Sequence, residues 1–149
     1  MADRERAQVY AAENAAFEGT SIESIVDFAD LTALAVRVTS NDWWPSPPPI
    51  VKQARNDAST STTVWRVGQP PEVRITRPQQ TRGTLVHELA HVLAGRNAGH
   101  GSMYRSAHLT VAESALGSEP AGWLGQAYRD FGLTIGPARW PRGSGAIAL

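Results

Sequence analysis

The residues whose types and spacing point most clearly to a chemical reaction are two histidines and a glutamate in one HExxH pentapeptide, which runs from His87 to His91. Residues four apart share one face of an α-helix, so both imidazoles can bind a single metal ion at about 2.0–2.1 Å. Glu88 is rotated by roughly 100° around the helix axis, which leaves its carboxylate beside the ion. Such a carboxylate can take a proton from a water that zinc has acidified, producing a nucleophile for a carbonyl carbon. The pattern predicts zinc-dependent hydrolysis with His87 and His91 as ligands and Glu88 as general base.

The same pentapeptide also has a purely structural interpretation. Two histidines could lie on a solvated helix face, with Glu88 present as a good helix former. We favour the catalytic interpretation because the apolar residues of this segment fall on the opposite arc of the helix, which leaves small neighbours around the histidines. That arc contains Leu85, Val86, Leu89, Val92 and Leu93.

A third metal ligand has to come from outside the pentapeptide, because catalytic zinc takes three protein ligands and keeps one open position for water. His100 is nine residues beyond His91, after a glycine-containing turn at 95–99 that allows the chain to reverse. Glu113 is the alternative, since a carboxylate on the following helix could also reach the ion. We take His100 as the third ligand and keep Glu113 as its rival.

Three polar side chains follow His100 at positions that could support the reaction. Tyr104, Arg105 or His108 could donate a hydrogen bond to the oxyanion of a tetrahedral intermediate, and Tyr104 is our candidate catalytic donor. The structural alternative, which we favour on general grounds, is that Tyr104 is a core aromatic residue and that Arg105 and His108 are surface groups.

The remaining pattern predicts the elements that position these residues. Apolar residues at helical spacing predict five helices, over residues 2–17, 22–38, 82–94, 102–116 and 120–131. Thr81 is the expected N-cap of the helix that carries the motif, and Gly95 is expected to end it. Segments rich in β-branched residues or alternating in polarity predict strands at 50–54, 62–67 and 72–76, joined in a small, mostly antiparallel sheet. The tail at 136–149 is expected to be irregular.

Composition limits the classes of protein that fit. A chain of 149 residues predicts a single domain, 1–149, and 14 basic against 14 acidic residues offer no excess charge to attract nucleic acid. The absence of cysteine excludes a disulfide framework, a cysteine-based zinc site and a thiol nucleophile. Without an apolar stretch of about 20 residues or an apolar leader, we expect a cytoplasmic protein with no membrane partner.

Two segments together carry a resemblance to a known family. The runs HELAH at 87–91 and GHGSMYR at 99–105 resemble the SprT-like zincins, in which a HExxH helix precedes a histidine–glycine pair and then an aromatic and a basic residue. The opening at 3–13 also resembles a small family of metallohydrolases from actinobacteria and their phages. The resemblance implies that His100 is the third zinc ligand and Glu88 the general base, in a compact domain whose sheet precedes the active-site helix.

These observations predict an α+β, minimal zincin-like domain with N-terminal helices, a small sheet, the HExxH helix and further helices behind it. The expected activity is zinc-dependent hydrolysis of an amide, with a peptide or protein as substrate and Zn²⁺ as cofactor. Strand 72–76 is expected to be an edge onto which an extended peptide adds. The alternative is a non-catalytic zinc-binding module with a regulatory role or a role in phage–host interaction.

Overall fold

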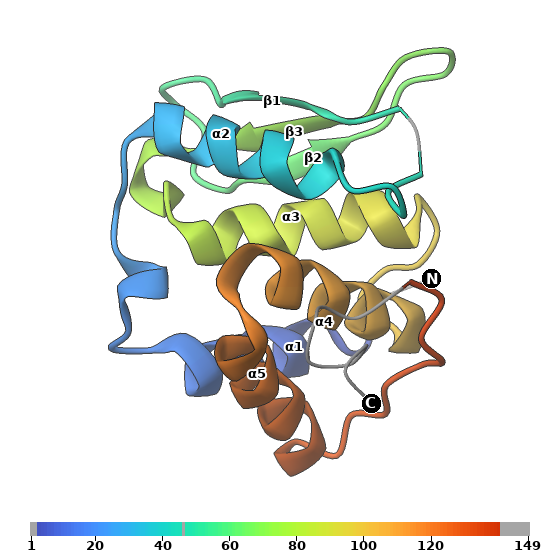
Figure 1. Ribbon diagram of the computed structural model, residues 1–149. Helices are drawn as coiled ribbons and strands as arrows, with labels where there is room; N and C mark the ends of the chain where they lie inside the picture. The colour runs from blue at the N-terminus through green and yellow to red at the C-terminus, as the bar shows by residue number, and fades with distance from the viewer. Residues whose placement is uncertain (1–2, 46, 141–149) are drawn as a thin grey trace.

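The computed structural model describes residues 3–45 and 47–140, and these form an α+β arrangement of helices around a small sheet (Figure 1). The α-helices are α1 (Arg6–Phe17), α2 (Phe28–Thr39), α3 (Arg82–Ala94), α4 (Ser102–Leu116) and α5 (Ser118–Asp130). The strands are β1 (Ile50–Gln53), β2 (Thr62–Val64) and β3 (Glu72–Ile75), and two short 3₁₀-helices are η1 (Ser21–Glu23) and η2 (Arg77–Gln79).

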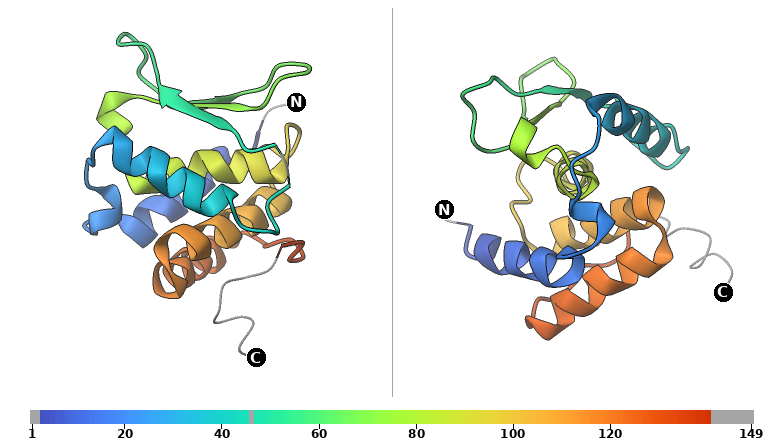
Figure 2. Two further views of the ribbon diagram at one scale, coloured as in Figure 1. Left: turned by 45° about the horizontal axis from the view of Figure 1, so that its top comes forward. Right: turned by 90° about the vertical axis from the view of Figure 1, so that its left-hand side faces the viewer.

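Helix α3, which carries the HExxH motif, runs through the middle of the structure. The sheet and α2 lie on one side of it, and α1, α4 and α5 lie on the other (Figure 2). Leu85, Val86 and Leu89 of α3 are fully buried. The elements on the two sides of α3 also bury His87 and Glu88, although these residues do not belong to the apolar side of the helix.

The two helices around the predicted site begin and end as the sequence indicates. The side chain of Thr81 accepts a hydrogen bond from the backbone N–H of Thr84, and this N-cap begins α3. Gly95 ends α3 with a φ of 103°, a conformation that side chains with a Cβ rarely adopt. Helix α4 spans the predicted residues 102–116 and ends at Gly117 in the same conformation.

The predicted helix 22–38 is wrong at residues 24–27, which are not helical, whereas residues 22–23 belong to the 3₁₀-helix η1. Ile25 forms an isolated antiparallel bridge with Thr81, and the N–H of Val26 donates to the carbonyl of Gln80. These long-range bonds hold the segment extended, so α2 begins only at Phe28. The helical spacing of the apolar residues could not reveal a partner more than fifty residues away.

The sheet is mixed rather than mostly antiparallel. Its strand order is β1-β3-β2, with β1 parallel and β2 antiparallel to β3. The prediction that strand 72–76 is an edge is therefore wrong, because β3 is paired on both sides and β2 is an edge. Alternating polarity indicates which side chains of a strand face the core, whereas strand order depends on where the connecting loops travel.

The other boundaries differ only at the ends of elements. The first helix begins at Arg6 and the last spans Ser118–Asp130, and the strand predicted for 62–67 ends at Val64. Residues 136–140 of the predicted irregular tail form no helix or strand, and 141–149 lie outside the described residues. None of the helices described has the length and apolar character needed to cross a membrane.

Candidate metal centre

Three imidazoles converge between α3 and the start of α4. His87 and His91 lie one turn apart on α3, and the turn after Gly95 brings His100 back toward them just before α4 begins. One ring nitrogen from each histidine lies within 4.8 Å of the other two. The structure brings together the three histidines preferred from the sequence, and Glu113 is not part of this group.

The separation of two of these nitrogens matches that of two ligands of a tetrahedral metal ion. Two nitrogens bound to zinc at 2.0–2.1 Å with a tetrahedral angle are separated by about 3.3 Å. Nε2 of His87 and Nε2 of His100 are 3.3 Å apart. The ring of His91 lies next to that of His100, with centroids 4.7 Å apart. A set of three imidazoles without cysteine is typical of open, catalytic zinc sites rather than of closed structural ones.

Two carboxylates hold the opposite edges of these rings. Nδ1 of His87 is 2.7 Å from Oε1 of Glu13, and Nδ1 of His100 is 2.5 Å from Oδ2 of Asp3. An ionised carboxylate only accepts hydrogen bonds, so each Nδ1 is the protonated nitrogen. With hydrogen on Nδ1, a neutral imidazole offers its Nε2 lone pair, and the two Nε2 atoms, 3.3 Å apart, can share one cation.

A second group of possible ligands consists of Glu13, His87 and His108. The 2.7 Å between Glu13 and His87 is a hydrogen-bond distance, clearly shorter than the roughly 3.3 Å expected between two ligands of one tetrahedral ion. His108 is fully buried, with its Nε2 3.8 Å from Oε2 of Glu13 and its Nδ1 2.5 Å from the hydroxyl of Tyr128. We therefore interpret Glu13 and His108 as residues that orient His87 and not as ligands of a second metal ion.

Electrostatics of the histidines follow from burial and from their carboxylate partners. Burial acts to lower the pKa of His87, but Glu13 outweighs it and raises that pKa above its ordinary value. Burial and the neighbouring imidazoles lower the pKa of His91 to about 2, and burial also lowers the pKa of His100. His91 and His100 are therefore neutral at physiological pH, the form in which histidine binds a metal.

Glu88 lies beside the three histidines and is buried. Its Oε1 accepts a hydrogen bond of 2.8 Å from Oγ1 of Thr63 on β2, which orients the carboxylate. Burial raises the pKa of Glu88 above that of an exposed glutamate. A carboxylate with a raised pKa takes up and releases a proton closer to neutral pH, as a general base requires.

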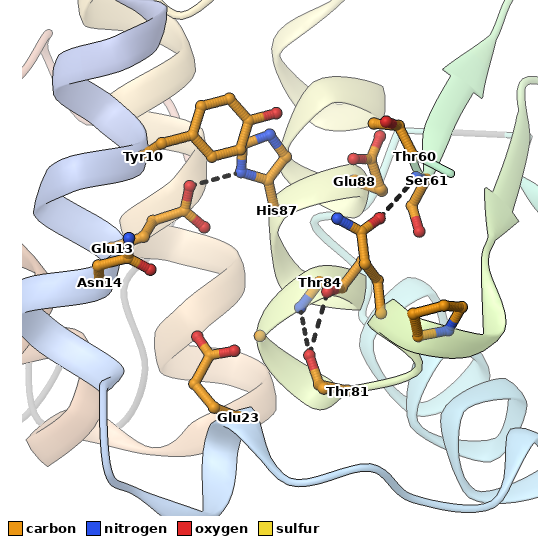
Figure 3. A pocket seen from close by; sticks show the side chains of 13 residues that line it. Tyr10, Glu13, Asn14, Glu23, Thr60, Ser61, Thr81, Thr84, His87 and Glu88 are labelled. Carbon is orange, nitrogen blue, oxygen red and sulfur yellow. Dashed lines mark hydrogen bonds and ion pairs between the residues drawn. The ribbon is translucent and has the colours of Figure 1, made fainter. Parts of the chain in front are cut away.

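Two cavities meet at Glu88. One, of about 240 Å³, extends from His87 and Glu88 toward Glu13 and Glu23. Figure 3 shows Tyr10 and Glu13 of α1 beside His87, with Glu88, Thr60 and Ser61 on the opposite side of the pocket. The other cavity, of about 470 Å³, exposes His91 and His100 and is lined also by Thr62, Thr63 and Trp65. A substrate could therefore pass on either side of Glu88.

Tyr10 is the aromatic residue that lines both cavities. Its ring stacks on that of His87, with centroids 5.0 Å apart and planes 15° apart. Burial raises the pKa of the Tyr10 hydroxyl, so the group keeps its proton and can donate a hydrogen bond.

The three polar side chains after His100 lie inside the structure. The hydroxyl of Tyr104 is fully buried and donates to the backbone carbonyl of His87 at 3.1 Å, and Tyr104 lines neither cavity. This position matches the core interpretation of Tyr104. The expectation that Arg105 and His108 are surface groups is wrong, because both are buried with polar partners. Single-residue polarity does not reveal partners supplied by distant segments.

Sequence reasoning missed the contribution of the N-terminal segment. Arg6, Tyr10 and Glu13 are spaced by four and three residues, which places them on one face of α1, and Asp3 precedes Arg6 by three residues. All four line at least one of the two cavities. The signal was present as a polar stripe on the first helix, but nothing in the local pattern connects it with a motif more than seventy residues away.

Comparison with known proteins supplies no relative. No protein-family model matches the chain, and neither a curated protein nor a solved structure matches it.

Proposed function

We propose that this protein is a zinc-dependent hydrolase that cleaves peptide bonds, a minimal zincin related to the SprT-like enzymes. His87, His91 and His100 would hold the ion, and Glu88 would be the general base. The observation that carries the proposal is the convergence of three imidazole nitrogens within 4.8 Å of one another, beside a buried carboxylate at the junction of two cavities.

Zinc bound there would act as a Lewis acid, which lowers the pKa of a bound water and polarises the carbonyl group of the substrate. Side chains of the protein would accept and donate the protons of the reaction. Glu88, oriented by Thr63, accepts a proton at its carboxylate and passes it to the departing amine. Tyr10 replaces Tyr104 as the candidate donor to the developing oxyanion. Tyr10 lines both cavities, whereas the hydroxyl of Tyr104 already donates a hydrogen bond to the backbone carbonyl of His87.

The edge strand β2 suits an extended peptide as substrate. Thr62 and Thr63 of β2 line the cavity that exposes His91 and His100, and within residues 3–45 and 47–140 this strand has a partner strand on one side only. A peptide that adds to β2 gains main-chain hydrogen bonds and runs past Glu88. This role passes to β2 from strand 72–76, which is central in the sheet.

The test is hydrolysis of a mixed peptide library, with cleavage read by mass spectrometry and zinc measured in the same samples. We expect the wild-type protein to cleave and Glu88→Gln to bind zinc equally well but lose turnover by at least about 100-fold, as loss of a general base does. Tyr10→Phe is expected to retain zinc and lower kcat, since it removes only the hydroxyl.

Other outcomes of this experiment are equally informative. Undiminished turnover by Glu88→Gln would remove Glu88 from the mechanism. Stoichiometric zinc with no cleavage of any peptide would favour the non-catalytic zinc-binding module instead.

A further inference from the structure

The metal-binding histidines lie on α3 and just before α4, but the groups that orient two of them come from the N-terminal segment. Glu13 belongs to α1, and Asp3 precedes that helix by three residues. Both are 70 or more residues from the histidines they contact. This segment therefore reaches across the structure to the metal centre.

The two contacts are equivalent in chemistry. In each, a carboxylate oxygen lies at hydrogen-bond distance from Nδ1 of a ligand imidazole, at 2.7 Å for Glu13 and 2.5 Å for Asp3. Each contact selects the tautomer with hydrogen on Nδ1 and leaves Nε2 for the metal, and it also increases the basicity of the ring. Without the carboxylate, an imidazole can turn or adopt the other tautomer.

The surroundings of Glu13 point to the same role. Glu13 and His87 are both buried, so this carboxylate would be costly without a partner. Nε2 of His108 lies 3.8 Å from the other oxygen of Glu13, and Nδ1 of His108 is within hydrogen-bond distance of the Tyr128 hydroxyl. Four buried side chains, from α1, α3, α4 and α5, therefore contact one another in series, and the series ends at the proposed ligand His87.

We propose that Glu13 and Asp3 are positioning residues of the metal centre, which hold the Nδ1–H groups of His87 and His100 and so present both Nε2 atoms to the ion. The N-terminal segment is thus a functional part of the site. This inference rests on the proposed metal centre, and its test separates the two.

The test measures the zinc affinity of the 149-residue protein by competition with a chromophoric chelator. Glu13→Gln keeps the shape of the side chain and removes its charge, and we expect zinc to bind about 10–100-fold more weakly. The control is Glu18→Gln, at an exposed position at the end of the same helix, with unchanged affinity. The Co²⁺-substituted protein supplies a spectroscopic readout, because altered ligand geometry shifts and weakens its visible absorption bands.

Asp3→Asn provides a second variant whose folding is less at risk, because the Asp3 side chain is 31% exposed and precedes the first helix. It should also weaken zinc binding about 10–100-fold, while leaving urea unfolding of the metal-free protein unchanged. Equal zinc affinity in wild type, Glu13→Gln and Asp3→Asn would overturn the inference and leave the proposed function intact. A wild-type protein that binds no zinc would overturn both.

Discussion

At the scale of single residues, the buried side chain of Arg105 fixes the segment that contains His100, next to the candidate metal centre. Its Nη1 donates to the carbonyl of His100 and to Glu5, both at 2.8 Å, and its Nε donates to the carbonyl of Thr134 at 2.6 Å. The guanidinium thus connects His100, in the turn before α4, to Glu5 and to Thr134. Glu5 is partly exposed, so the backbone bonds contribute more than the ion pair.

We predict that Arg105→Lys lowers the free energy of unfolding by about 1–3 kcal/mol, because an ammonium group cannot reproduce the planar fork of donors. Urea unfolding of the metal-free protein measures the change. Arg129→Lys, at an exposed position of α5, is the matched control and should shift stability by less than about 0.5 kcal/mol. Equal effects of the two substitutions would show that the hydrogen bonds of Arg105 contribute no more to stability than those of an exposed arginine.

At the scale of elements, the central strand β3 is secured by charge as well as by backbone pairing. Oε1 of Glu72 is 2.6 Å from Nε of Arg74 on the same strand and 3.1 Å from Nζ of Lys52 on β1. Lys52 and Arg74 are register partners in the parallel pair, so the three side chains share one face of the sheet. The hydrogen bonds from Arg74 and Lys52 lower the pKa of Glu72 below its ordinary value.

A lowered pKa in the folded state predicts a defined pH dependence. Glu72 stabilises the fold above its ordinary pKa of 4.5, and this contribution disappears as pH falls through the lower folded-state value. We predict that Glu72→Gln is less stable than wild type at pH 7 and that the difference shrinks toward pH 3, as measured by urea unfolding at both values. Asp57→Asn, which breaks an exposed pair with Arg55, should have little effect. A difference that stays constant or grows toward pH 3 would contradict the assignment.

At the scale of the whole molecule, the candidate metal centre joins segments from both halves of the chain. The proposed ligands come from α3 and the turn before α4, their carboxylate partners come from the N-terminal segment, and Thr63 of β2 orients Glu88. The unfolded chain cannot gather these groups. A bound ion therefore stabilises the folded state by mass action.

We predict that zinc at 100 times its dissociation constant stabilises the protein by about 2.7 kcal/mol, which raises Tm by about 5–11 °C for a chain of this size. A chelator should reverse the shift, and His91→Ala should not respond to zinc at all. Thermal unfolding with and without zinc measures both effects. A zinc-dependent shift that persists in His91→Ala would indicate that the ion binds elsewhere.

Local pattern was sufficient for the motif-bearing part of the protein. Helices at 82–94 and 102–116, the cap at Thr81 and the stop at Gly95 follow from helical periodicity and end signals over a few residues. His87, Glu88 and His91 share a region of one helix for the same reason. The glycine-containing turn also made His100 the better third candidate, and the structure brings it to the other two histidines.

Tertiary structure decided what depends on contacts between distant segments. It placed β3 at the centre of the sheet, kept residues 24–26 out of a helix, buried Arg105 and His108, and brought Asp3, Tyr10 and Glu13 to the cluster of His87 and His100. Periodicity records which side of an element is apolar, because that follows from the geometry of the element itself. Which segments then meet depends on how all the elements pack at once, and no short stretch of sequence contains that information.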